Sequence, residues 1–126
     1  MKIPTVFLLE DDKDLLEGMC LALQAEDYKV ECFSHSAAFI LALSKASPQA
    51  IVIDVNLPDG QGDLIAQEIK QTHSQAKTPI ILISATLDLA RKAKQSGADA
   101  YLAKPFSLKD LVTTVQSQIQ RSPDHE

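Results

Sequence analysis

Short apolar runs alternate along the whole chain with longer stretches in which apolar residues recur at helical spacing. The runs are four or five residues long, and their β-branched content and flanking turns favour strands. A strand followed by a helix five times in succession requires parallel strands covered by helices on both faces. The predicted strands span residues 5–9, 29–33, 50–53, 79–83 and 100–103.

The helix of clearest periodicity is the last one, in which five apolar residues form a continuous stripe from Leu108 to Ile119. The stretch 87–95 is weaker, because its apolar face consists mainly of alanines. Right-handed crossovers and a length of 126 residues favour an open, doubly wound α/β sheet. A closed barrel of parallel strands and helices would need about 250 residues.

Composition and charge exclude several classes of protein. Hydrophobic residues make up 45% and charged residues 23% of the chain, as in globular domains, and the net charge of −5 argues against direct nucleic-acid binding. The apolar runs are far shorter than the about 20 residues of a membrane span, and no signal peptide is recognisable. Cys20 and Cys32 have no metal-ligand spacing, which predicts reduced, mostly buried thiols in a cytoplasmic protein.

Polar residues follow the predicted strands at the edge where such folds bind ligands, beyond the carboxyl ends of the strands. The first strand is followed by three consecutive acids, and the others by single polar residues. These residues are Glu10, Asp11 and Asp12 after the first strand, Asp54 after the third, Ser84 after the fourth and Lys104 after the fifth.

Each of these residues also has a purely structural interpretation. The acidic triplet could cap and charge a helix start, and Asp54 could make local turn bonds. Ser84 could cap the next helix, and Lys104 could be a solvated charge. Their joint placement favours a functional site, because crowded carboxylates require a proton or a cation. Carboxylate oxygens suit Mg²⁺, and a lysine beside them suits a phosphate oxygen, which suggests phosphoryl transfer onto a carboxylate.

Four segments resemble the receiver domains of two-component response regulators, and the resemblance covers about residues 3 to 120. Val6 to Asp12 is similar to their first strand and acidic pocket, and Ile51 to Gly60 to their phosphoacceptor strand and loop. The other two are Ile83-Ser84-Ala85, similar to their switch hydroxyl, and Tyr101 to Phe106 with its Lys-Pro pair. The resemblance implies a flavodoxin-like (βα)5 fold with strand order 2-1-3-4-5.

The resemblance also implies a role for each matching residue. Asp54 accepts phosphate, and Ser84 and Lys104 contact the phosphoryl oxygens, with a cis bond between Lys104 and Pro105. Mg²⁺ is bound by Asp11 and Asp54, by Glu10 mainly through water, and by the backbone carbonyl of Asn56. Tyr101 reorients when Ser84 moves, unless it is an ordinary half-buried strand residue. Asp12 lies one position beyond the matching pair and is interpreted as a helix-start charge.

The implied function is a signalling module and not a turnover enzyme. A histidine kinase or a phosphotransfer protein would phosphorylate Asp54, and the face of the fourth helix, fifth strand and last helix would then change for partner binding or homodimerisation. The Ser84–Lys104 segment is about two residues shorter than in the family, which leaves the transmission of the switch open. The receiver domain is expected to end near residue 120, and 121–126 is a polar tail or a linker to a missing effector domain.

Two alternatives remain at this point. A Mg²⁺-dependent phosphohydrolase with an aspartyl-phosphate intermediate typically carries a second Asp two residues after the nucleophile, where this chain has Asn56. Such an enzyme also needs a cap or an extra domain for its substrate. A phosphorylation-independent interaction domain of the same fold would be indicated by loss of an acidic residue, Asp54 or Lys104, and all of these are present.

Overall fold

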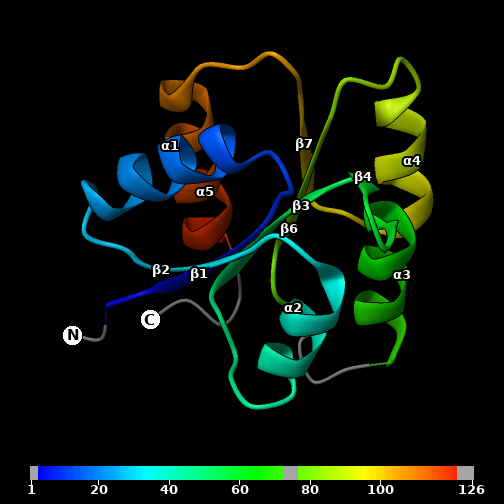
Figure 1. The fold of residues 1–126 in the computed structure, drawn as a ribbon, viewed down its shortest axis with the longest axis horizontal. Helices are drawn as coiled ribbons and strands as arrows, with labels where there is room; N and C mark the ends of the chain where they lie inside the picture. Colours follow the sequence, from blue (N-terminus) through cyan, green and yellow to red (C-terminus); the bar gives the residue numbers. More distant parts are fainter. Residues whose placement is uncertain (1–2, 73–76, 122–126) are drawn as a thin grey trace.

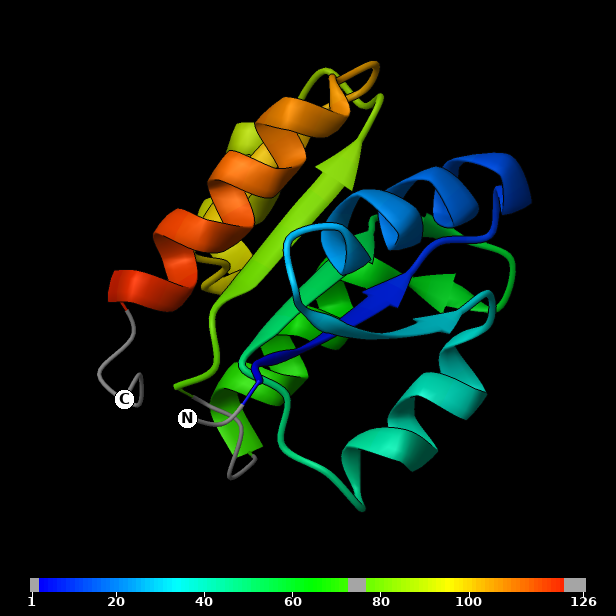
Figure 2. The same cartoon turned by 90° about the vertical axis from the view of Figure 1, so that its left-hand side faces the viewer.

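Five parallel strands form the main sheet of the computed structural model, which describes residues 3–72 and 77–121. Their order is β2-β1-β3-β6-β7, which is 2-1-3-4-5 when the strands of this sheet are counted along the chain, and the predicted fold is confirmed. The arrows of the sheet run in one direction (Figure 2). The strands are β1 (Thr5–Leu9), β2 (Lys29–Phe33), β3 (Ala50–Asp54), β6 (Ile80–Ser84) and β7 (Ala100–Ala103).

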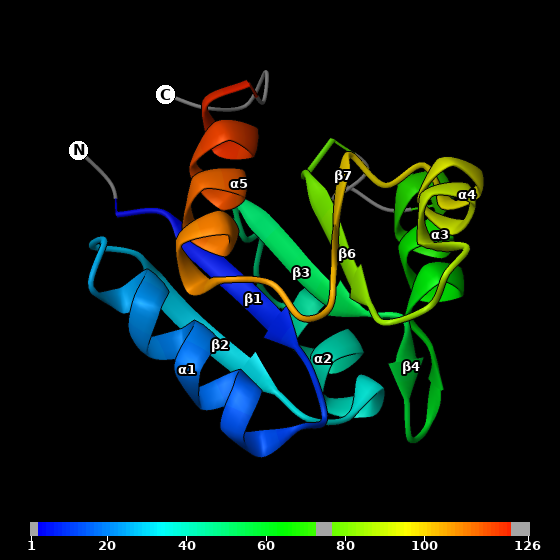
Figure 3. The same ribbon diagram turned by 90° about the horizontal axis from the view of Figure 1, so that it is seen from above.

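Helices cover the sheet on both faces, as a doubly wound fold requires. Helices α1 and α5 lie on one face, and α2, α3 and α4 lie on the other (Figures 1 and 3). The helices are α1 (Lys13–Gln24), α2 (Ser36–Leu43), α3 (Gly62–Thr72), α4 (Leu89–Ser96) and α5 (Leu108–Arg121).

Alternate residues of the central strands form two separate cores, because successive side chains of a strand point to opposite faces. In β1, Phe7 and Leu9 pack toward α2, α3 and α4, whereas Val6 and Leu8 pack toward α1 and α5. All residues of β3 and β6 are buried, which explains their continuous apolar sequences. The two packed layers hold the carboxyl ends of β1, β3 and β6 side by side.

The observed boundaries differ from the predicted ones near the site. Strands β3 and β6 end at Asp54 and Ser84, one residue later than predicted, because these residues still pair with Ile83 of β6 and Ala103 of β7. Helix α4 begins after its cap residue Asp88, so Leu87, predicted to be helical, precedes the helix. A short antiparallel pair, β4 (Asn56–Leu57) and β5 (Gly60–Gln61), was not predicted.

Three further expectations concern the surface and the end of the chain. The thiols of Cys20 and Cys32 are free, but Cys32 is exposed because β2 is an edge strand, so the prediction of mostly buried thiols is wrong for this residue. Arg121 is the last residue of α5 and not the start of a tail, and 122–126 lie outside the described residues. Among the described helices, none has both the length and the apolar composition needed to cross a membrane.

Candidate functional site

Backbone hydrogen bonds between neighbouring strands fix the residues at the carboxyl edge of the sheet. The N–H of Glu10 donates to the carbonyl of Phe33 at 3.0 Å and continues the β1–β2 ladder by one residue. The N–H of Lys104 donates to the carbonyl of Ser84 at 2.8 Å and does the same for β6 and β7. The candidate residues therefore sit on or directly beyond rigid strands and not on a free loop.

Three carboxylates converge at this edge. Oxygens of Glu10, Asp11 and Asp54 lie within 4.8 Å of one another, with Glu10 and Asp54 buried and Asp11 exposed. The second oxygen of Glu10, Oε2, accepts a hydrogen bond from the N–H of Asp12 at 3.0 Å. Such a set of oxygen ligands, open to solvent on one side, fits a hard divalent cation.

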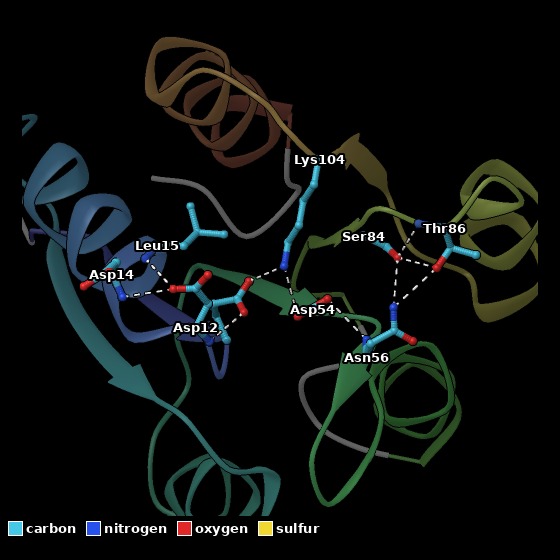
Figure 4. A network of polar contacts seen from close by, with 9 residues as sticks. Asp12, Asp14, Leu15, Asp54, Asn56, Ser84, Thr86 and Lys104 are labelled. Atoms are coloured by element: carbon cyan, nitrogen blue, oxygen red, sulfur yellow. Dashed lines mark hydrogen bonds and ion pairs between the residues drawn. The ribbon is translucent and has the colours of Figure 1, made fainter.

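Asp12 faces away from this cluster, as predicted. Its Oδ1 accepts hydrogen bonds from the N–H groups of Asp14 at 3.0 Å and Leu15 at 3.1 Å, so it caps helix α1 (Figure 4). The acidic triplet thus divides into two residues of the carboxylate cluster and one helix cap. The structural interpretation of the triplet is correct for its third member.

Lys104 joins the two buried carboxylates. Its Nζ lies 2.8 Å from Glu10 Oε1 and 3.1 Å from Asp54 Oδ2. Figure 4 shows the ammonium directed toward the Asp54 carboxylate. The alternative of a solvated charge is therefore wrong. The peptide bond from Lys104 to Pro105 is cis, as the resemblance implied.

Burial and charge shift the pKa values of this pair. Burial raises the pKa of Glu10, and the negative charge of Asp54 adds to this, against the lowering effect of the hydrogen bond from Lys104. Burial also disfavours the Lys104 ammonium, but its hydrogen bond to Glu10 and the charge of Asp54 prevail and raise the pKa of Lys104. With all groups ionised, the three carboxylates and one ammonium carry a net charge of −2, which one divalent cation would neutralise.

Asn56, Ser84 and Thr86 form a second polar group beside Asp54. The Asn56 N–H donates to Asp54 Oδ1 at 3.2 Å, so Asp54 does make the local turn bond considered from the sequence. The buried Ser84 hydroxyl lies 2.6 Å from Thr86 Oγ1, and the Asn56 side chain reaches both hydroxyls (Figure 4). Ser84 does not cap α4, whose cap residue is Asp88.

Tyr101 lies on β7, the edge strand next to β6. It is paired with Leu82 in register, and the residue is 49% exposed. The structure therefore places Tyr101 at the surface, two residues before the backbone partner of Ser84. A change of orientation of Tyr101 stays a prediction.

Three residues near the site were not singled out from the sequence. Gly62 begins α3, and a Cβ at this position would lie 2.0 Å from the Asp54 carbonyl oxygen. Thr86 follows Ser84 by two residues, a spacing that brings its hydroxyl to the Ser84 side chain. Asp59, between β4 and β5, accepts hydrogen bonds from the N–H groups of Ser36 at 3.0 Å and Ala37 at 3.4 Å.

Asp59 thereby caps helix α2 from a distant part of the chain. The cap residue of α2 itself, His35, makes no side-chain capping bond, so the hairpin loop supplies the acceptor. A link of this kind ties the segment that follows Asp54 to the first turn of α2. A lone Asp in a turn gives no sequence signal for a partner 23 residues earlier.

Asp59→Ala is expected to lower the free energy of unfolding near neutral pH, because the first N–H groups of α2 lose their acceptor. Backbone hydrogen bonding from Ser36 holds the pKa of Asp59 below its usual value. A carboxylate with a lowered pKa stabilises the fold above its unfolded-state pKa, and this contribution is lost as the pH falls through its folded-state pKa.

Urea unfolding should therefore give a lower free energy of unfolding for Asp59→Ala than for the native chain at pH 7. This difference should shrink below about pH 3. Asp59→Asn keeps an acceptor oxygen without the titrating proton, so its stability relative to Asp59→Ala should vary little with pH. A difference between the native chain and Asp59→Ala that stays constant with pH would contradict this account of the cap.

Comparison with known proteins identifies the family. The family model of the response regulator receiver domain matches residues 6–116. The chain belongs to this family. Phosphoaspartate formation and magnesium binding at an acidic pocket are characteristic of receiver domains, and the acidic cluster of this receiver domain is formed by Glu10, Asp11 and Asp54.

Relatives of this receiver domain are transcriptional regulators and receiver domains. The regulatory protein QseB of Haemophilus influenzae is 33% identical over 116 residues, which cover 92% of this chain and 52% of QseB. The response regulator DrrB of Thermotoga maritima, an OmpR/PhoB homologue, has a TM-score of 0.85 at 28% identity, covering 95% of this chain and 54% of DrrB. The chemotaxis response regulator CheY4 of Vibrio cholerae has a TM-score of 0.84 at 26% identity and is covered over 98% of its length.

The receiver domain spans about half the length of the regulators that it matches. QseB and the full-length DrrB both extend well beyond the matched part. In contrast, CheY4 is matched over nearly its whole length. The matched relatives therefore include chains about twice as long as the matched part and chains that scarcely exceed it.

Proposed function

We propose that this receiver domain accepts a phosphoryl group on Asp54 from a histidine kinase or a histidine phosphotransfer protein. The observation that carries the proposal is the position of Lys104 between Glu10 and Asp54, with Asp11 completing an acidic cluster. A nucleophilic carboxylate, a cation beside it and oxygen ligands for a metal are the parts that phosphoryl transfer needs.

In the proposed reaction, a carboxylate oxygen of Asp54 forms the new bond to phosphorus. The bond between phosphorus and the imidazole nitrogen of phosphohistidine breaks, and its electron pair returns to that nitrogen. Lys104, held by Glu10, is placed to pair with a phosphoryl oxygen, and its raised pKa keeps it protonated near neutral pH. Ser84 would donate a hydrogen bond to a second oxygen after its side chain turns toward Asp54.

Glu10, Asp11, Asp54 and the backbone carbonyl of Asn56 are proposed to hold Mg²⁺. The bound ion would neutralise the excess charge of the cluster and of the incoming phosphoryl group. The net charge of −2 on the ionised cluster and the oxygen-only donor set support this assignment. Glu10, whose Oε1 contacts Lys104, would act mainly through a metal-bound water.

The proposed output is a change of the face formed by α4, β7 and α5. The support is the backbone bond between Lys104 and Ser84, which joins the pocket to β7, and the exposed apolar side chains of these elements and the loop before α4. The exposed residues on this face are Leu87 and Tyr101. We propose that this face binds a partner or a second copy in the cytoplasm, and that an effector domain follows residue 121 in the whole protein. The domain would act as a signalling module and not as a turnover enzyme.

The proposal is tested by incubating the chain with acetyl phosphate and Mg²⁺ and measuring its intact mass. One phosphoryl group per chain is expected, and none when Mg²⁺ is removed by a chelator. Borohydride reduction followed by peptide mapping then locates the acyl phosphate. A phosphoryl group on any residue other than Asp54, or labelling that is indifferent to Mg²⁺, would refute the assignment.

Asp11→Ala is expected to weaken Mg²⁺ binding by at least about tenfold. Substitution of a residue that only hydrogen-bonds to a metal ligand already lowers metal affinity by about that factor, and loss of a ligand should lower it at least as much. Removing a charge from a crowded set should also leave the fold at least as stable in metal-free buffer. Asp12→Asn is the matched control, since it removes the same charge one residue later and keeps an oxygen for the α1 cap. Titration of Mg²⁺ followed by amide resonances gives both affinities. Equal affinities in Asp11→Ala and the native chain would exclude Asp11 as a ligand.

A further inference from the structure

The Ser84 hydroxyl has its hydrogen-bonding capacity filled on the side away from Asp54. Its Oγ accepts the backbone N–H of Thr86 at 3.0 Å and an Nδ2–H of Asn56 at 3.4 Å. A serine hydroxyl has two acceptor sites and one proton. With both acceptor sites taken, its proton is directed to its third partner, Thr86 Oγ1, at 2.6 Å.

Thr86 Oγ1 can take this proton because its other close contact is also a donor. Asn56 Nδ2 lies 3.4 Å from Thr86 Oγ1 and 3.4 Å from Ser84 Oγ, so one amide, with its two hydrogens, can donate to both hydroxyls. Figure 4 shows the three side chains as a closed group beside Asp54, with Lys104 on the other side of that carboxylate. We name Ser84, Thr86 and Asn56 the Ser84 latch.

We infer that the Ser84 latch holds the domain in its resting state, and that Thr86 sets how readily phosphorylation switches it. This inference rests on the proposed function, in which Ser84 must donate its proton to a phosphoryl oxygen on Asp54. The hydroxyl has one proton, so Thr86 Oγ1 and the phosphoryl group compete for it. A bond present in one state and absent in the other shifts the equilibrium between the two states.

The geometry separates the two parts of Thr86. Its backbone N–H holds Ser84 Oγ whatever the side chain is, whereas its hydroxyl alone receives the Ser84 proton. Thr86→Val removes the hydroxyl and keeps the shape of the side chain, which is only partly buried. Thr86→Ser keeps the hydroxyl and serves as the matched control.

The test uses Mg²⁺ and beryllofluoride, a mimic of the phosphoryl group, with binding followed by the amide resonances of residues 84–106. Thr86→Val should bind beryllofluoride about two- to tenfold more tightly than the native chain, the range that one net hydrogen bond corresponds to. Thr86→Ser should bind like the native chain. Asn56→Ala, which removes the weaker 3.4 Å contacts, should shift the affinity in the same direction by less.

A double-mutant comparison shows whether the effect passes through Ser84. In a Ser84→Ala background, Thr86→Val should change the affinity for beryllofluoride by less than about twofold, because no proton remains to compete for. The latch would be overturned if Thr86→Val raised the affinity for beryllofluoride equally in the Ser84→Ala background and in the native chain. It would also be overturned if Thr86→Val did not raise this affinity in the native chain. Saturable binding that is lost in Asp54→Ala supports the proposed function in either case. If the native chain binds no beryllofluoride, or if Asp54→Ala still binds it, the proposed function fails and the latch with it.

Discussion

Asp54→Asn is expected to show no detectable phosphoryl transfer from acetyl phosphate, whereas the native chain takes up one phosphoryl group. The amide is almost the same size as the carboxylate but is not a nucleophile at neutral pH, so the bond to phosphorus cannot form. Intact mass measured in parallel on both proteins checks the result. Asp12→Asn, which removes a nearby carboxylate that caps α1, should be labelled like the native chain.

Asp54→Asn should leave the fold intact, which distinguishes loss of the nucleophile from loss of the structure. Lys104 keeps its ion pair with Glu10 at 2.8 Å when the charge on Asp54 is removed. The pKa of Glu10 should fall in Asp54→Asn, because the negative charge of Asp54 is one of the causes that raise it. A pH titration of the Glu10 side chain by NMR measures this shift. Labelling of Asp54→Asn at the native level would place the phosphoryl group elsewhere.

Much of the candidate site could be predicted because parallel strands bring their carboxyl ends to one edge. Asp54 and Ser84 lie far apart in the sequence, yet the apolar runs before them pair in register as neighbouring strands β3 and β6. Periodicity locates the runs, and the topology then brings the residues that follow them together. The same logic placed Lys104 beside Glu10, on strands that are separated by two others in the sheet.

The features that were missed depend on contacts between segments and not on periodicity. The hydrogen bond from the Ser36 N–H to Asp59 joins residues 23 positions apart, and no sequence pattern around either residue indicates the contact. The start of α4 was predicted too early because Leu87 extends the apolar stripe, although the structure leaves it fully exposed and begins the helix after Asp88. Asp88 occupies the cap position without making a side-chain capping bond, and its carboxylate pairs with Arg91, so the capping preference of Asp does not explain this helix start.

Gly62→Ala is expected to lower the free energy of unfolding by at least about 3 kcal/mol, the upper part of the range for overpacking. An added Cβ would lie 2.0 Å from the carbonyl oxygen of Asp54 and 2.6 Å from Ile53 Cγ2. The first of these atoms belongs to the backbone of a buried central strand and cannot rotate away. Urea unfolding followed by circular dichroism measures the effect.

Two other glycines provide matched controls for this substitution. A Cβ at Gly60 would meet Ile65 Cδ1 and Ser36 Oγ at 3.7 Å, an ordinary contact, so Gly60→Ala should have little effect. Gly18 lies within helix α1 with Leu108 Cδ1 at 3.8 Å, and alanine there should stabilise the fold by about 0.5–1 kcal/mol. A Gly62→Ala variant as stable as Gly60→Ala would show that α3 is not pressed against β3.

The consequence of Gly62→Ala for the site follows from where the clash occurs. The Gly62 N–H donates to the carbonyl of Val55 at 2.8 Å, so the start of α3 is held against the segment that carries Asp54 and Asn56. To admit a Cβ, either α3 or the end of β3 must move. We expect the end of β3 to move, which would displace the Asp54 carboxylate from Lys104. Any folded Gly62→Ala protein should therefore take up phosphate more slowly than the native chain, although no reactive group has been removed. If a strongly destabilised Gly62→Ala protein takes up phosphate at the native rate, then α3 moves and the carboxyl edge of the sheet does not. The position of Asp54 would in that case depend on β1 and β6 alone.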